Sequence, residues 1–129
     1  MHLIPNNSKT ILVVEDEPLV LKMLTTMLER LGHVVLAANS PSEAIYLVKK
    51  SERDIDLVLT DVIMPDINGR LLAEVLIAIK PEMKFIFMSG YTANIMVDQD
   101  GFDENVCFLQ KPFTKKELVE KIQKSLDER

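Results

Sequence analysis

The sequence predicts a doubly wound α/β domain, a three-layer sandwich in which a parallel five-stranded sheet lies between two layers of helices. Short apolar segments alternate with amphipathic helical patterns five times along the 129 residues. The apolar segments are continuous rather than alternating, which is typical of strands buried on both faces and therefore of a parallel sheet. Right-handed crossovers then favour a (βα)5 topology with the strand order 2-1-3-4-5.

The first two strands are predicted at residues 10–14 (TILVV) and 34–38 (VVLAA). Between them a helix is expected at 18–31, because Pro18 suits the first helical turn and Gly32 suits the position just after the last turn. The apolar face of this helix is expected to comprise Val20, Leu24, Met27, Leu28 and Leu31.

The segment 40-SPSE-43 is a capping box with proline at the first helical position, so a second helix is expected from there through Val48. A third strand follows at 56–60 (DLVLT). The third helix is predicted at 70–80, and Pro81 ends it. Its inward face is expected to comprise Leu71, Leu72, Val75, Leu76 and Ile79.

The fourth strand is predicted at 84–89 (KFIFMS) and the fifth at 106–109 (VCFL), with a weaker helical pattern at 93–97 between them. A second capping box, 114-TKKE-117, opens the last helix. The apolar positions of that helix are Leu118, Val119, Ile122 and Leu126.

Composition argues against several classes of function. The net charge is −5, whereas a nucleic-acid-binding surface needs clustered Lys and Arg. Cys107 is the single cysteine, so no disulfide can form within the chain, which fits a reducing compartment. His2 and His33 are far apart and have no cysteine or acidic neighbours at ligand spacing, so no zinc site is expected.

Residues 1–8 are expected to form a flexible polar tail before a single domain at 9–129. The tail lacks the apolar segment of a signal peptide. No window approaches the roughly 20 apolar residues that a membrane span needs. We therefore expect a soluble cytoplasmic domain that binds neither membrane nor nucleic acid.

Polar side chains follow the predicted strands at the points where they end. Glu15 and Asp16 follow the first strand, Asp61 follows the third, Ser89 ends the fourth, and Lys111 comes shortly after the fifth. In a doubly wound sheet, ligands bind at the carboxyl ends of the strands, near the switch point between strands 1 and 3. These side chains are therefore expected to share one pocket.

Three carboxylates at such short range repel each other, so positive charge must offset them. Mg²⁺ prefers oxygen ligands of this kind, and Lys111 supplies a second positive charge. A metal ion, a lysine and the Ser89 hydroxyl together suit a phosphoryl group. Asp61 lies centrally and is the best candidate for the nucleophile, with Glu15 and Asp16 holding the metal.

Four segments, each at the end of a predicted strand, carry a family resemblance: 11-ILVVEDE-17, 57-LVLTDVIMPDINGR-70, 88-MSGYT-92 and 108-FLQKPF-113. The chain resembles the receiver domain of two-component response regulators over residues 9–127, and the last two segments also look like receivers of hybrid sensor histidine kinases. The resemblance implies a flavodoxin-like (CheY-like) fold. It also implies a phosphoryl-accepting signalling switch in a phosphorelay, not an enzyme.

For the acidic pocket, the resemblance implies that Asp61 is the phosphoryl-accepting aspartate. Glu15 and Asp16 occupy the acidic-pair positions that bind Mg²⁺, with Asp16 the more direct ligand, and the backbone carbonyl of Ile63 is a further ligand. Two positions depart from the usual pattern. Glu15 stands where Asp is commoner, and Ile63, which flanks the site with Tyr91, is apolar where a polar residue is frequent.

For the switch, the resemblance implies that Lys111 pairs with the phosphoryl group and is joined to Pro112 by a cis peptide bond. Ser89 and Phe108 match the two switch positions. Phosphorylation by a sensor histidine kinase or a histidine phosphotransfer domain would draw Ser89 inward and let Phe108 turn in. This would alter the surface of helix 4, strand 5 and helix 5, a face that could also form a dimer.

Each of these residues also has a simpler interpretation. Asp61 could be a turn or cap residue, Ser89 ordinary strand-end chemistry, and Lys111 a solvated lysine. Phe108 could be a core residue, and Glu17 fits a charge that favours the helix dipole.

Three rival functions are weighed against the switch. An aspartyl-phosphate phosphatase needs a second acid two residues after the nucleophile, where this chain has Ile63. A degenerate receiver would not keep the full set of Asp61, Asp16, Ser89 and Lys111. A flavin-binding domain shares the topology, but acids follow the first strand here and would repel a phosphate.

Overall fold

The computed structural model describes residues 8–90 and 106–127 of the chain. The predicted helix at 93–97, Tyr91 and residues 1–7 of the predicted tail lie outside these ranges. Ser8, the first described residue, donates from its hydroxyl to the carbonyl of Gly32 at 2.7 Å. The elements in chain order are β1 (Thr10–Val14), α1 (Pro18–Arg30), β2 (Val34–Ala38), α2 (Pro41–Lys50), β3 (Leu57–Asp61), α3 (Gly69–Ile79), β4 (Lys84–Ser89), β5 (Cys107–Gln110) and α5 (Lys115–Asp127).

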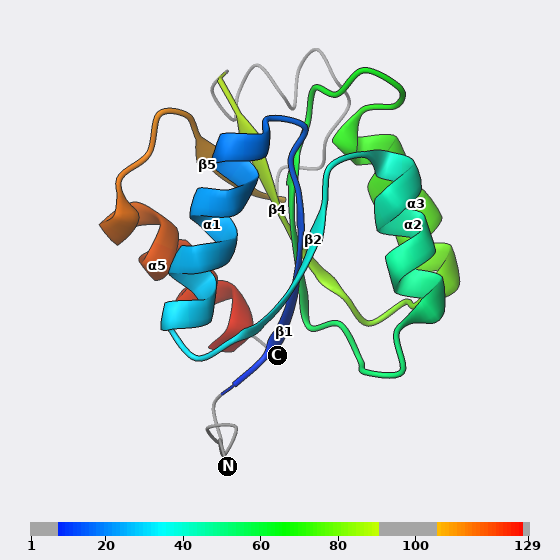
Figure 1. The fold of residues 1–129 in the computed structure, drawn as a ribbon, viewed down its shortest axis with the longest axis horizontal. Coiled ribbons are helices and arrows are strands. Elements are labelled where there is room, and N and C mark those ends of the chain that lie inside the picture. Colours follow the sequence, from blue (N-terminus) through cyan, green and yellow to red (C-terminus); the bar gives the residue numbers. More distant parts are fainter. Residues whose placement is uncertain (1–7, 91–105, 128–129) are drawn as a thin grey trace.

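The predicted sheet is confirmed. Its five strands run parallel in the order β2-β1-β3-β4-β5. Helices α1 and α5 cover one face, and α2 and α3 cover the other (Figure 1). Alternate residues of β1 point to opposite faces of the sheet. Ile11 and Val13 pack with α1 and α5, whereas Leu12 and Val14 pack with α2 and α3. Strand β1 is thus buried on both sides, which explains its continuous apolar sequence.

Two strands are shifted by one residue from their predicted ends. The third strand includes Asp61, which the sequence placed just after it, because Asp61 pairs in register with Met88 of β4. The fifth strand likewise continues to Gln110, opposite Ser89. The apolar residues mark only part of each strand, because the ladder of backbone hydrogen bonds continues past the last apolar side chain, and Asp61 at the end of β3 is still buried.

The inward faces of two helices were predicted with errors. On α3, Leu72 and Leu76 are buried as expected, but Leu71 and Val75 are exposed, at 41% and 39%, and Gly69 and Ala73 complete the buried face. On α1, Leu24 and Leu28 are buried as expected, but Leu31 lies past the helix end and is 37% exposed. Helix α3 is apolar on most sides, so its periodicity could not single out the face that packs. Small residues occupy part of that face because the sheet lies close.

The helix ends follow the predicted capping chemistry. At α5, the Thr114 hydroxyl accepts from the Glu117 N–H and the Glu117 carboxylate accepts from the Thr114 N–H, both at 3.1 Å. At α2, Ser40 caps as expected, but the Glu43 carboxylate accepts from the N–H of Asn39, one residue earlier than the capping box predicts. Among the described residues, no helix combines the length and apolar character that crossing a membrane requires.

Candidate functional site

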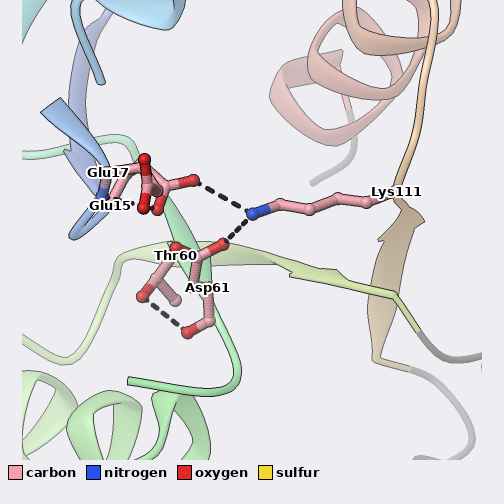
Figure 2. A network of polar contacts seen from close by, with 5 residues as sticks. All are labelled: Glu15, Glu17, Thr60, Asp61 and Lys111. Atoms are coloured by element: carbon pink, nitrogen blue, oxygen red, sulfur yellow. Dashed lines mark hydrogen bonds and ion pairs between the residues drawn. The ribbon is translucent and has the colours of Figure 1, made fainter. Parts of the chain in front are cut away.

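The carboxyl edge of the sheet brings Glu15, Asp61 and Lys111 together from three separate strand ends (Figure 2). Glu15 directly follows β1, and its N–H donates to the Ala38 carbonyl of β2 at 3.1 Å. Glu15 and Asp61 are buried, at 1% and 4% exposure. Two acidic residues buried in this way are unusual unless a positive charge compensates them.

Lys111 supplies that charge. Its side chain extends from the end of β5 toward both acids, and Nζ lies 2.6 Å from Asp61 Oδ1 and 3.0 Å from Glu15 Oε1 (Figure 2). The backbone also fixes its place, because the Lys111 N–H donates to the Ser89 carbonyl at 2.7 Å. The Lys111–Pro112 peptide bond is cis. Lys111 is therefore held by two ion pairs, with 35% of its side chain exposed.

The acidic residues fit a divalent cation. One carboxylate oxygen from each of Glu15, Asp16 and Asp61 lies within 4.8 Å of the others, and Asp16 is the exposed member of the three. The Glu15 carboxylate is also held in place, because its Oε2 accepts from the Glu17 N–H at 3.2 Å. Hard oxygen ligands with an open, solvated side are what Mg²⁺ prefers in proteins.

Burial raises the pKa of the Asp61 carboxyl to about 8. The nearby Glu15 adds to this rise through a hydrogen bond and charge repulsion, whereas Lys111 acts in the opposite direction. Without a metal ion, Asp61 is therefore costly to ionise at neutral pH, and any cation that enters the pocket competes with a proton.

Burial also acts to raise the pKa of Glu15, but hydrogen bonds from Asp61 and Lys111 outweigh it and leave the pKa below its ordinary value. For Lys111, burial acts to lower the pKa, and the hydrogen bonds and charges of the two acids raise it overall. The three groups therefore favour one charged acid, Glu15, paired with a charged lysine. Of the two acids, Asp61 is the one whose pKa is raised.

The predicted switch residues lie in the two neighbouring strands β4 and β5. Ser89 is the last residue of β4 and is 5% exposed, one position beyond Met88, the register partner of Asp61. Phe108 of β5 is half-buried, and its ring centroid lies 6.0 Å from that of Phe87. Ile63 follows β3 by two residues, and its side chain is 64% exposed.

Two residues at the site were missed by sequence reasoning. The Thr60 hydroxyl donates to the Asp61 carbonyl at 3.0 Å. The Cα of Gly69 lies so close to the same carbonyl that a Cβ would overlap its oxygen. The Asn68-Gly69 pair at the start of α3 was the available signal, since a glycine at a helix start often marks a close approach of backbone.

Known proteins are similar to this chain in sequence and in fold. The family model of the response regulator receiver domain matches residues 11–123. The chain is 34% identical to the sensor kinase CckA of Brucella abortus (strain 2308) over 122 residues, covering 95% of this chain and 13% of CckA. It is 30% identical to the response regulator receiver protein CpdR of the same organism over 118 residues, covering 92% and 97% of the two chains.

Solved structures agree with these similarities. The receiver domain of the hybrid histidine kinase CckA superimposes with a TM-score of 0.77 at 32% identity, covering 92% of this chain and 99% of that one. The chemotaxis regulator CheY4 of Vibrio cholerae has a TM-score of 0.80 at 22% identity, covering 92% and 99%, and so supports the fold alone. The chain spans 13% and 25% of the curated relatives CckA and the regulator NtrC of Azospirillum brasilense. The chain belongs to the family of response regulator receiver domains, the phosphoacceptor domains of two-component signalling.

Proposed function

We propose that Asp61 accepts a phosphoryl group from a phosphohistidine, carried by a sensor histidine kinase or a histidine phosphotransfer domain. Receiver domains interact with such kinases or phosphotransfer partners. The observation that carries the proposal is the position of Asp61, which is buried at the end of β3 with Lys111 Nζ 2.6 Å from its carboxylate. A nucleophile is thereby held beside a fixed positive charge.

The proposed transfer is a substitution at phosphorus. A carboxylate oxygen of Asp61 forms a bond to phosphorus while the bond between phosphorus and the histidine nitrogen breaks, and the departing imidazole takes up a proton. Lys111 stays in place to neutralise charge on the phosphoryl oxygens, and the Ser89 hydroxyl donates a hydrogen bond to one of them.

Mg²⁺ is the proposed cofactor. Glu15, Asp16, Asp61 and the backbone carbonyl of Ile63 would hold it, which fits the close carboxylate oxygens of the three acids. When bound, it would neutralise negative charge on the phosphoryl oxygens. Its positive charge would also favour the ionised form of Asp61, which is the nucleophilic form.

Phosphorylation would place a charge of about −2 beside Lys111, which is the proposed trigger of the switch. We propose that Ser89 and Phe108 respond, and that the surface formed by β5, α5 and the fourth helix, predicted at 93–97, changes. That face is also the proposed contact in a dimer. The domain itself acts as a phosphoacceptor, without binding nucleic acid and without turning over a separate substrate.

The phosphatase alternative is disfavoured by Ile63. Such an enzyme needs a second acid two residues after its nucleophile, whereas here an exposed apolar side chain occupies that position. The degenerate receiver is disfavoured by the ion pairs of Lys111 with Asp61 and Glu15, which bring together the groups proposed for phosphoryl transfer.

The proposal is tested by intact mass spectrometry after incubation with a small acyl phosphate and Mg²⁺. We expect one added phosphoryl group on the wild type and none on Asp61→Asn. The matched control is Asp66→Asn, which removes an exposed carboxylate from the adjacent loop and should leave the adduct unchanged. An unmodified wild type, or an undiminished adduct on Asp61→Asn, would refute the proposal.

A further inference from the structure

We infer that Thr60 and Gly69 form a main-chain clamp on Asp61 and are positioning residues for its carboxylate. The two residues lie nine positions apart in sequence, in β3 and at the start of α3, and both meet the carbonyl oxygen of Asp61. The inference rests on the proposed phosphorylation of Asp61. It adds two residues that are not among the proposed ligands of the phosphoryl group or the metal.

Thr60 forms the first half of the clamp. It is completely buried, and a buried hydroxyl needs a hydrogen-bond partner. Its Oγ1 donates to the Asp61 carbonyl at 3.0 Å, as Figure 2 shows. The bond runs to the next residue along the chain, so it restrains the peptide that follows Asp61. A valine of the same shape would fill the space without that restraint.

Gly69 forms the second half of the clamp. A Cβ on Gly69 would overlap the Asp61 carbonyl oxygen and would come within 3.1 Å of both the Asp61 carbonyl carbon and the Val62 Cα. The Gly69 N–H donates to the Val62 carbonyl at 2.6 Å. The first residue of α3 thus lies directly against the main chain that carries Asp61 and leaves no room for a side chain.

The surrounding backbone cannot easily move to relieve such an overlap. The Val62 N–H donates to the Met88 carbonyl at 3.0 Å, which ties this segment to β4. On the other side, Asn68 caps α3 by accepting from the Leu71 N–H at 2.9 Å. A side chain on Gly69 would therefore displace the Asp61 peptide, and with it the carboxylate that faces Lys111.

The clamp matters because phosphoryl transfer depends on position. A nucleophile displaced by about 1 Å can lose on the order of 100-fold in rate. Loss of one hydrogen bond to the main chain is a smaller disturbance, which should cost about 3- to 10-fold. Since the segment after Asp61 also supplies the proposed Ile63 carbonyl ligand, Mg²⁺ binding should weaken together with the rate.

The test compares Thr60→Val, Thr60→Ser and Gly69→Ala with the wild type. Three quantities are measured: the rate of phosphorylation by a small acyl phosphate, the Mg²⁺ dissociation constant by calorimetry, and thermal unfolding. Thr60→Ser keeps the hydroxyl and should restore both rate and affinity to within about twofold of wild type. Val48→Ala is the control for stability alone, because Val48 is fully buried in the α2 layer, away from Asp61.

We expect Thr60→Val to lose about 3- to 10-fold in both rate and Mg²⁺ affinity, and Gly69→Ala to lose more, while Val48→Ala loses only thermal stability. The inference is wrong if Thr60→Val keeps the wild-type phosphorylation rate and Mg²⁺ affinity. It is also wrong if Thr60→Val loses no more of either quantity than Val48→Ala does, because Thr60 is then only a structural residue. If the wild type itself takes no phosphoryl group, the proposed function fails and the inference fails with it.

Discussion

At the scale of single residues, the site consists of two acids that contact the same lysine but differ in pKa. Glu15 and Asp61 both contact Lys111 Nζ, yet only the pKa of Asp61 is raised, to about 8. Burial is the main cause, and Glu15 reinforces it. The residue that is to act as nucleophile is therefore the one whose charge the metal-free protein tolerates least.

The raised pKa of Asp61 predicts that Asp61→Asn changes the stability of the protein. Because the pKa of Asp61 in the folded protein lies above its ordinary value of 3.8, its contribution to stability is complete below pH 3.8 and is lost as the pH rises toward about 8. At pH 7 without metal, Asp61→Asn should raise the free energy of unfolding by about 1–3 kcal/mol, since Lys111 keeps Glu15 as a partner. Urea unfolding measures this, and a less stable variant would contradict it.

Lys111 is expected to act through its charge. Lys111→Met keeps much of the side-chain length but removes the positive group 2.6 Å from Asp61, so the phosphorylation rate should fall by about 100-fold or more. The rate is measured by quenching the reaction at a series of times and recording the intact mass. Lys115→Met, at an exposed position at the start of α5, should behave as wild type, and an equal loss in both variants would exclude a specific role.

At the scale of elements, the strands could be predicted because burial on both faces leaves a continuous apolar segment. The helices could be predicted from the spacing of their apolar residues. The capping boxes and Gly32, with its positive φ of 94°, marked helix ends correctly. The buried face of α3 could be predicted only in part, at Leu72 and Leu76, since the exposed Leu71 and Val75 are just as hydrophobic. Which face is buried depends on where the neighbouring layer lies, and a single helix does not encode that.

The connection between α1 and β2 is expected to respond to pH. His33 Nδ1 accepts from the Lys9 N–H at 3.1 Å, and burial lowers the pKa of His33, with Lys9 adding to this and Asp56 opposing it. Because the folded-state pKa lies below 6.5, the contribution of His33 to stability is present above pH 6.5 and is lost as the pH falls.

His33→Asn, whose amide oxygen could replace Nδ1 as acceptor, should flatten the pH dependence of unfolding between about pH 7 and pH 5. Urea unfolding at a series of pH values measures the slope for both proteins. Equal slopes for wild type and variant would show that His33 does not titrate on unfolding.

At the scale of the whole molecule, the order of the parallel strands brings the residues of the site together. Glu15, Asp61 and Lys111 are far apart in sequence and meet only because parallel strands end at one edge of the sheet (Figures 1 and 2). That meeting could be predicted from strand order and strand ends. The clamp of Thr60 and Gly69 could not, because a glycine at the start of a helix signals only a close approach of backbone, and neither residue type shows that the partner is the Asp61 carbonyl.

The pocket also predicts that Mg²⁺ stabilises the whole domain. Binding to the folded state alone, at a concentration 100 times the dissociation constant, should raise the free energy of unfolding by about 2.7 kcal/mol. Asp16→Asn should reduce the gain, because Asp16 belongs to the close group of carboxylates, whereas Asp66→Asn should keep it. Urea unfolding with and without Mg²⁺, at constant ionic strength, measures the effect, and equal gains in both variants would place the metal elsewhere.

The central claim is that Asp61 is the residue that accepts the phosphoryl group, and chemical mapping tests it most directly. Borohydride reduces an aspartyl phosphate to homoserine, so reduction after treatment with acyl phosphate and Mg²⁺ marks the modified residue permanently. We predict homoserine at position 61, detected by peptide mass spectrometry, and its disappearance when Mg²⁺ is removed by chelation. Homoserine at another acid, such as Asp16 or Asp66, with position 61 unchanged, would contradict the account.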